Sequence, residues 1–459
     1  MSNFIFKSIK SDLALGISLL VFFFLTTLSV YLRPIADDYC VASIATSGLF
    51  NHFQLITTTW SGDYIQIFFS YFLVASPIAF GPNFLVGLLT LLLSVFLLIL
   101  AVAGILHFVL PEVCFEINKR VFIILSALLL MGWVIYWALP ASLNTFGEYK
   151  SFLSAPEGFS AVFGWPTAIV QYLVVPLLLS ILAMRLQKIG AIWTISYAVL
   201  GLAIGTAGYA MALAVFVAVP IFILRKTFIL KPMRFVLLEV GILIGVYLSF
   251  YSQGAQNRTA QIFESESNGN NVSLSRSIFV SFVELLVAIL NLGTITVFLL
   301  VFLFITLLPH RQVVLKSTFK LNRFVASFTI FLIIYYLVIS ASEYFTYPAF
   351  WHLITFKMLL FIYIVLLAII LATQGQRNYS VRLVRARRGS LVLLLLSLIA
   401  IGASTPPIKS IQDRGSLWEE QSAPLPGISD ISPKGGWVDS CWVSLREFRG
   451  WEERRYDPV

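Results

Sequence analysis

Long apolar runs alternate with short polar linkers along most of this 459-residue chain. Many of the runs approach the roughly 20 residues that an α-helix needs to cross the hydrocarbon core of a bilayer. The pattern therefore predicts an all-α polytopic membrane protein. The runs lie at residues 12–32, 65–80, 84–110, 121–139, 166–184, 190–205, 209–224, 235–250, 278–308, 324–342, 355–373 and 389–403.

Composition agrees with this prediction. Hydrophobic residues make up 59% of the chain and charged residues 12%, with a mean hydropathy of +0.91. Soluble globular domains contain about 25% charged residues. The first run lacks a small-residue cleavage site of the Ala-x-Ala kind, so we expect it to be retained as a membrane span.

Basic residues in the linkers orient the predicted spans. By the positive-inside rule, linkers rich in Lys and Arg face the cytoplasm. The net charge of +9 therefore reports orientation first, and we expect membrane lipids rather than a nucleic acid as partners. Such linkers contain Lys7 and Lys10, Lys119 and Arg120, Arg185 and Lys188, Arg225 to Arg234, Arg311 to Arg323, and Arg377 to Arg388.

The basic clusters also fix the number of crossings. Three apolar runs separate Lys10 from Lys119, yet two cytoplasmic ends require an even number of crossings. The shortest run, 65–80, is predicted to lie in the outer leaflet without crossing. A helical hairpin is expected to turn at Thr206 to Tyr209. Eleven spans result, with the N terminus cytoplasmic and the C terminus outside.

This topology places four loops and the C-terminal tail on the extracytoplasmic face. The loops are residues 33–83, 140–165, 251–277 and 343–354, and they hold most of the acidic residues outside the tail. Residues 1–403 are expected to form one transmembrane domain. Residues 404–459 are expected to form a short extracytoplasmic appendage, because so few residues cannot bury a large core of their own.

The first outer loop begins with an adjacent pair of acids in "ADDYC", Asp37 and Asp38. Two neighbouring carboxylates repel each other, and a divalent cation or a cationic ligand would offset this repulsion. Alternatively, the pair caps the N terminus of a short helix, where acidic side chains are favourable. The residue types alone leave both interpretations open.

The chain resembles the GT-C glycosyltransferases, most closely bacterial branches of that class. The resemblance depends on "ADDYC", on "TWSGDY" about twenty residues later, on "FGWPTAIVQY" in the second outer loop and on "SQGAQNRTA" in the third. It implies a GT-C-like fold with in-plane helices in the first outer loop. It also implies an inverting transferase of the bacterial inner membrane, moving a sugar from a polyprenyl-phosphate donor to a glycan, lipid or cell-envelope acceptor on the outer face.

The resemblance assigns roles to particular residues. Asp37 matches the first-loop acid that acts as general base, and Asp38 would hold a metal ion or the acceptor. Arg258 in "QNRT" matches the basic residue that holds the donor phosphate. A basic residue is expected after "WSG" in close relatives, but this chain has Asp63, which is a second candidate metal ligand. The cation would be Mg²⁺, Mn²⁺ or Ca²⁺.

Other residues are candidates on position. Lys357 lies just inside the tenth span, where it would either meet a phosphate or snorkel to the interface. Glu284 lies near the outer end of run 278–308 and faces either the donor groove or the interface. For Trp60 and Tyr64, and for the pair Glu343 and His352, interfacial packing is the alternative. The full set of candidates for the donor or acceptor groove is Trp60, Asp63, Tyr64, Trp165, Glu284, Glu343 and His352.

Two other functions compete with a transferase. A transporter or flippase of lipid-linked sugars would carry charged residues in the middle of several spans. A ligase or polymerase of O-antigen type would need a large late outer loop with Arg and His. The three cysteines lack metal or redox spacing. Cys40 and Cys441 are expected outside, where a disulfide between them is a weak alternative to two free thiols, and Cys114 is expected inside.

Overall fold

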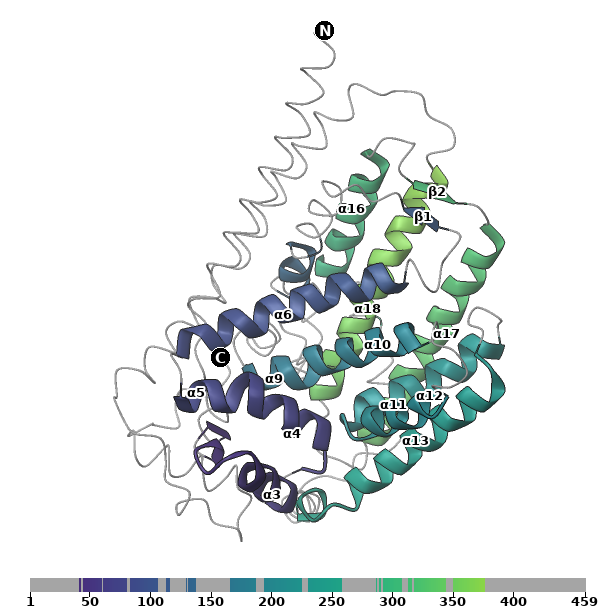
Figure 1. The fold of residues 1–459 in the computed structure, drawn as a ribbon. Helices are drawn as coiled ribbons and strands as arrows, with labels where there is room; N and C mark the ends of the chain where they lie inside the picture. Colours follow the sequence, from purple (N-terminus) through teal and green to yellow (C-terminus); the bar gives the residue numbers. More distant parts are fainter. Residues whose placement is uncertain are drawn as a thin grey trace, which may run out of the picture.

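In the computed structural model, most of the described residues lie in helices (Figure 1). Its elements follow the apolar runs closely. The described residues are 41–42, 44–59, 61–80, 83–105, 113–115, 129, 131–137, 166–186, 194–224, 230–257, 286, 289, 292–307, 313–315, 318–343 and 350–375.

Most of the described helices coincide with predicted runs. Run 65–80 forms one irregular helix, and run 166–184 forms another. The elements are α3 (Leu49–Thr59), α4 (Tyr64–Ser70), η2 (Tyr71–Ala75), α5 (Ser76–Phe80), α6 (Asn83–Gly104), α9 (Pro166–Ile169), η5 (Val170–Val174), α10 (Val175–Leu186), α11 (Ser196–Gly205), α12 (Tyr209–Leu224), α13 (Pro232–Phe250), α16 (Leu292–Leu307), α17 (Thr318–Glu343) and α18 (Phe350–Gly375).

Two of these helices contain a π-helical segment immediately before a proline. The Ser76 N–H bonds to the Tyr71 carbonyl, and the Val175 N–H bonds to the Val170 carbonyl, each five residues back. Pro77 and Pro176 follow directly. In a regular α-helix the proline ring would clash with the carbonyl four residues earlier, and a wider turn relieves this clash.

The predicted hairpin between α11 and α12 is present. Its turn runs through Thr206 to Gly208, and Gly208 adopts a φ of +116°. Only glycine adopts such a backbone conformation without a steric cost, so this residue allows the chain to reverse within three positions.

A parallel pair of glycine motifs holds α11 against α13. Gly201 and Gly205 on α11 face Gly241 and Gly245 on α13, and a Cβ at any of the four would overlap a backbone carbonyl oxygen of the other helix. Small residues spaced four apart let helix backbones approach closely within a membrane. Because α12 returns the chain between them, α11 and α13 run in the same direction.

One short two-stranded ladder departs from the expected all-helical fold. Strand β1 (Val113–Phe115) pairs antiparallel with β2 (Val313–Leu315), so that Cys114 lies opposite Val314. The strands come from linkers that carry the basic pairs Lys119 and Arg120 and the cluster from Arg311 to Arg323. The ladder therefore joins two linkers that the charge pattern assigns to the same side of the membrane.

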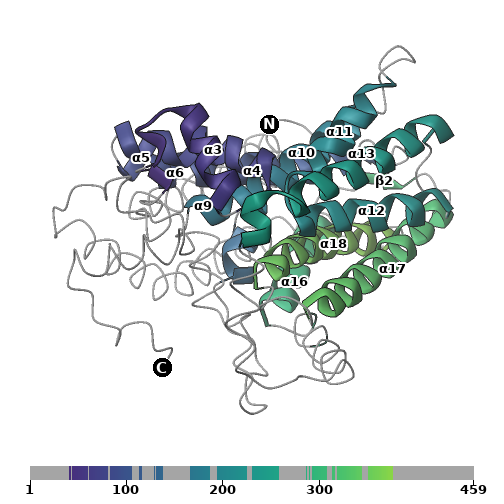
Figure 2. The same ribbon diagram turned by 90° about the horizontal axis from the view of Figure 1, so that it is seen from below.

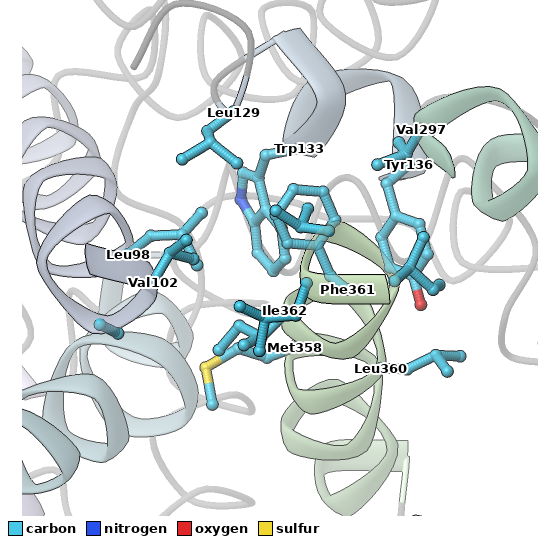
Figure 3. Packing of buried hydrophobic residues seen from close by; sticks show 14 of the residues in the cluster. Leu98, Val102, Leu129, Trp133, Tyr136, Val297, Met358, Leu360, Phe361 and Ile362 are labelled. Atoms are coloured by element: carbon cyan, nitrogen blue, oxygen red, sulfur yellow. The ribbon is translucent and has the colours of Figure 1, made fainter. Parts of the chain in front are cut away.

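Two hydrophobic cores meet along the α9–α10 helix. The first involves α6, residues 129 and 131–137, α16, α17 and α18, and it includes the edge-to-face pair Trp133 and Phe361, with ring centroids 4.9 Å apart (Figure 3). The second involves residues 41–45, the helices from α3 to α5, and α11 to α13. Leu173 belongs to the first core and Val170 to the second, so the α9–α10 helix contributes to both. Figure 2 shows α16, α17 and α18 on one side of the bundle and α11 and α13 on the other.

Three described helical stretches are long and apolar enough to cross a membrane, namely Pro166–Ala183, Pro232–Phe250 and Thr355–Ala372. The helix Tyr64–Phe80 is shorter. At a rise of 1.5 Å per residue it spans about 25 Å, less than the roughly 30 Å of a hydrocarbon core. That it does not cross the membrane stays a prediction, as does the total of eleven spans, because runs 12–32 and 389–403 lie outside the described residues.

Candidate functional site

Three of the eleven predicted site residues have described side chains: Asp63, Tyr64 and Lys357. Glu343 ends α17 and His352 lies in the first turn of α18, but their side chains are not described. Asp37, Asp38, Trp60, Trp165, Arg258 and Glu284 lie outside the described residues, as do Cys40 and Cys441.

In the loop between α3 and α4, the Asp63 carboxylate is held by hydrogen bonds within the loop itself. The Ser61 hydroxyl donates to Asp63 Oδ2 at 2.9 Å, and the Asp63 N–H donates to Ser61 Oγ at 3.1 Å. Asp63 is the N-cap residue of α4, but its side chain makes no capping hydrogen bond. The carboxylate is therefore oriented by the loop rather than by the helix that follows.

This loop is fixed against the ends of α11 and α13. Gly62 accepts a hydrogen bond at 2.7 Å from the Ser249 hydroxyl, and a Cβ at position 62 would overlap the Ser249 carbonyl oxygen and Ser252 Oγ. The Ile65 N–H donates to the Thr206 carbonyl at 3.1 Å. Glycine is required at position 62 because no side chain fits between the loop and α13.

Two side-chain amides extend this junction. Gln66 donates to the Ala207 carbonyl, and its side-chain amide fills the space that a Cβ on Gly208 would need. Asn257 donates to the Thr58 carbonyl at 3.0 Å. Three segments that the charge pattern places outside are thus joined here: the first outer loop, the α11–α12 turn, and the start of loop 251–277.

Tyr64 packs within the first outer loop. Its ring stacks on Phe53 of α3, with centroids 5.7 Å apart and planes 27° apart. This contact fits the interfacial alternative for Tyr64, because the ring holds α3 and α4 together.

His52 on α3 is a buried imidazole behind the same loop. It has no exposed surface and contacts the Tyr71 ring edge-to-face, with centroids 5.1 Å apart. Burial lowers its pKa to about 4, although the nearby Val41 backbone opposes the shift. His52 is therefore neutral at physiological pH and contributes packing rather than proton transfer.

Lys357 is buried near the beginning of α18. It retains 4% of its accessible surface, and its ammonium nitrogen lies 4.6 Å from the Trp137 ring centroid and 5.9 Å from that of Tyr136. The Trp137 Nε1 is also buried, with no hydrogen-bond acceptor in the part of the chain that the structure describes. The two ring faces offset part of the ammonium charge by cation–π attraction. A buried cation in a membrane helix is a candidate for binding an anionic ligand.

Two buried ionisable residues on α13 were not predicted as site residues. Arg234 lies with its guanidinium carbon 5.4 Å from the Tyr197 ring centroid, and it retains 7% of its surface. Glu239 retains 9%. The available signal for Glu239 was its place as a single acid inside apolar run 235–250, because acids within spans are functional candidates by default.

No metal site is formed by the described residues alone. Among them, no group of three His, Cys, Asp or Glu side chains lies close enough to hold an ion. Asp63 is the one predicted metal ligand with a described side chain. The divalent cation therefore stays a prediction.

The fold and these buried charged residues define a helical membrane protein with polar sites inside its bundle. Comparison with protein-family profiles, with curated proteins and with solved structures found no match for this chain.

Proposed function

We propose that this protein is an inverting glycosyltransferase of GT-C type, which moves a sugar from a polyprenyl-phosphate donor to an acceptor on the extracytoplasmic face. The observation that carries the proposal is the buried Lys357 beside Trp137. A lipid-linked donor brings a phosphate to the edge of the membrane, and pairing with this phosphate would offset the cost of burying the Lys357 ammonium.

The junction around Gly62 gives further support. It attaches the first outer loop, which carries Asp37, Asp38 and Asp63 in the sequence, to the ends of α11 and α13. A loop held in this way keeps Asp63 at one place along the bundle. Catalysis by positioned groups requires such rigidity, because small displacements of a base reduce the rate strongly.

In the proposed reaction the acceptor hydroxyl oxygen attacks the anomeric carbon opposite the phosphate. The bond between the anomeric carbon and the phosphate oxygen breaks, and its electron pair leaves with the polyprenyl phosphate. Asp37 takes the hydroxyl proton, while Lys357 and Arg258 stabilise the leaving phosphate. Attack from the opposite face inverts the configuration of the sugar.

Sugar transfer from a radiolabelled polyprenyl-phosphate donor by purified protein tests the proposal. Asp37→Asn preserves shape and removes the base, so turnover is expected to fall by at least about a hundredfold while donor binding survives. Lys357→Met is expected to raise KM for the donor, whereas Lys231→Met, at the exposed N-cap of α13, is the matched control. Full activity in Asp37→Asn would remove the assigned base, and full activity in Lys357→Met would remove the proposed phosphate site.

A flippase of lipid-linked sugars is the second candidate function. Buried Arg234, Glu239 and Lys357 inside helices favour it, because charged residues within spans line transport paths. Proteoliposomes containing a fluorescent lipid-linked sugar separate the two functions. Movement of the lipid between leaflets without transfer to an acceptor would support the flippase, and transfer without movement would support the enzyme.

A further inference from the structure

Glu239 lies in the interior of α13, one of the helices that are long and apolar enough to cross a membrane. It follows Pro232 by seven residues and precedes Phe250 by eleven. At 1.5 Å per residue these separations are about 10 and 16 Å along the helix axis. The carboxyl group is therefore distant from both ends of the helix.

Among the described residues, the Glu239 carboxyl group has no hydrogen-bond partner. Both of its oxygens are buried and make no hydrogen bond in the part of the chain that the structure describes. The neighbouring helices α11 and α12 contain no Asp, Glu, Lys, Arg or His, and their ionisable side chains are Tyr197 and Tyr209, each at one end of its helix.

Arg234 is the one basic residue within α13 itself. It precedes Glu239 by five positions, which places it about 140° further round the helix. Its guanidinium lies over the Tyr197 ring on α11. Arg234 therefore faces α11, and Glu239 faces a different direction.

An ionised carboxylate in such a place loses its hydration without gaining a counterion, a loss that favours the neutral acid. The outer surface of α13 gives no aqueous alternative, because it is strongly apolar. The large exposed side chains of α13 are Met233, Val236, Val240, Leu243, Ile244, Tyr247, Leu248 and Phe250.

We propose that Glu239 is a proton-binding site within the membrane, which carries its proton at neutral pH. This proposal does not depend on the transferase proposal. Its ligand is a proton, and a bound Na⁺ is the competing occupant that the experiment must exclude.

Infrared spectroscopy of the purified protein in lipid nanodiscs at pH 7 is the decisive measurement. The carbonyl stretching band of a protonated carboxylic acid is expected in the wild type and should be lost in Glu239→Gln. Gln has nearly the same shape and no charge, so this variant is expected to fold with an unchanged melting temperature. A band of equal intensity in both proteins, or a band that is absent whenever Na⁺ replaces choline in the buffer, would overturn the proposal.

Labelling with dicyclohexylcarbodiimide gives an independent test. A protonated carboxyl adds to this apolar reagent: its oxygen bonds to the carbodiimide carbon, and its proton moves to a carbodiimide nitrogen. Mass spectrometry is expected to find the adduct on Glu239 at pH 7 and none in Glu239→Gln. Two results together would show that Glu239 is ionised: an adduct yield in the wild type no higher than in Glu239→Gln, and an infrared band of the same intensity in both proteins.

Discussion

Replacing Gly62 by alanine tests how the first outer loop is attached to the bundle. The added Cβ has no room, because it would overlap the Ser249 carbonyl oxygen and Ser252 Oγ. The loop must therefore move away from α13, and this movement breaks the 2.7 Å hydrogen bond between the Ser249 hydroxyl and the Gly62 carbonyl.

The expected cost of Gly62→Ala is the sum of two effects. Inserting a methyl group into a well-packed contact costs about 1–3 kcal/mol. Losing one hydrogen bond costs about 1 kcal/mol. The free energy of unfolding should therefore fall by about 2–4 kcal/mol. Ser249→Ala removes the hydrogen bond without the overlap and should cost about 1 kcal/mol alone.

Thermal unfolding in detergent micelles, together with limited proteolysis of the first outer loop, measures the effect. Gly132→Ala is the matched control, because the added Cβ would lie 3.5 Å from its nearest neighbour, Val297 Cγ1, which is an ordinary van der Waals distance. Gly62→Ala is expected to melt at a lower temperature than this control and to be cleaved faster in the loop. Equal melting temperatures and equal cleavage rates in the two variants would refute the reasoning.

Two further predictions concern α11, α13 and α3. Gly241→Val forces α11 away from α13, since even a Cβ there overlaps the Ala198 carbonyl oxygen, and the cost should be about 1–3 kcal/mol in a thermal melt. His52 has a pKa lowered from 6.5 to about 4 by burial, so the unfolded chain binds its proton first as the pH falls. The contribution of neutral His52 to the free energy of unfolding is thus fully present above pH 6.5, and about 3 kcal/mol of it is lost as the pH falls towards 4. His52→Phe should remove this decline from unfolding curves measured across that range, and a pH dependence equal to that of the wild type would count against it.

The sequence predicted the described helices well because their signal is local. The run 209–224 and α12 agree at both ends, and the α11–α12 turn contains Thr206 as expected. Apolar periodicity and glycine placement are properties of a few neighbouring residues. The π-helical segments also had a local signal, because Pro77 and Pro176 mark where a regular helix is strained.

The contacts between distant segments were not predictable in this way. The ladder of β1 and β2, the fit of Gly62 against Ser249 and the burial of Lys357 against Trp137 each join residues far apart in the chain. Sequence position placed Lys357 just inside a span, but it left phosphate binding and snorkelling as alternatives. Burial at 4% exposure argues against snorkelling, because a snorkelling ammonium would reach water.

The β1–β2 ladder has a consequence for the order of events during biosynthesis. Val113 pairs with Leu315, so about 200 residues must be synthesised between the two strands. At about 5–20 residues per second the ribosome needs about 10–40 s for this stretch. Throughout that interval β1 has no partner strand, while the helices from α9 to α16 are made and packed. The ladder therefore forms late in synthesis, because its second strand is made long after its first. A chain terminated after α16 would lack β2, and β1 with Cys114 would then lack the strand that it pairs with.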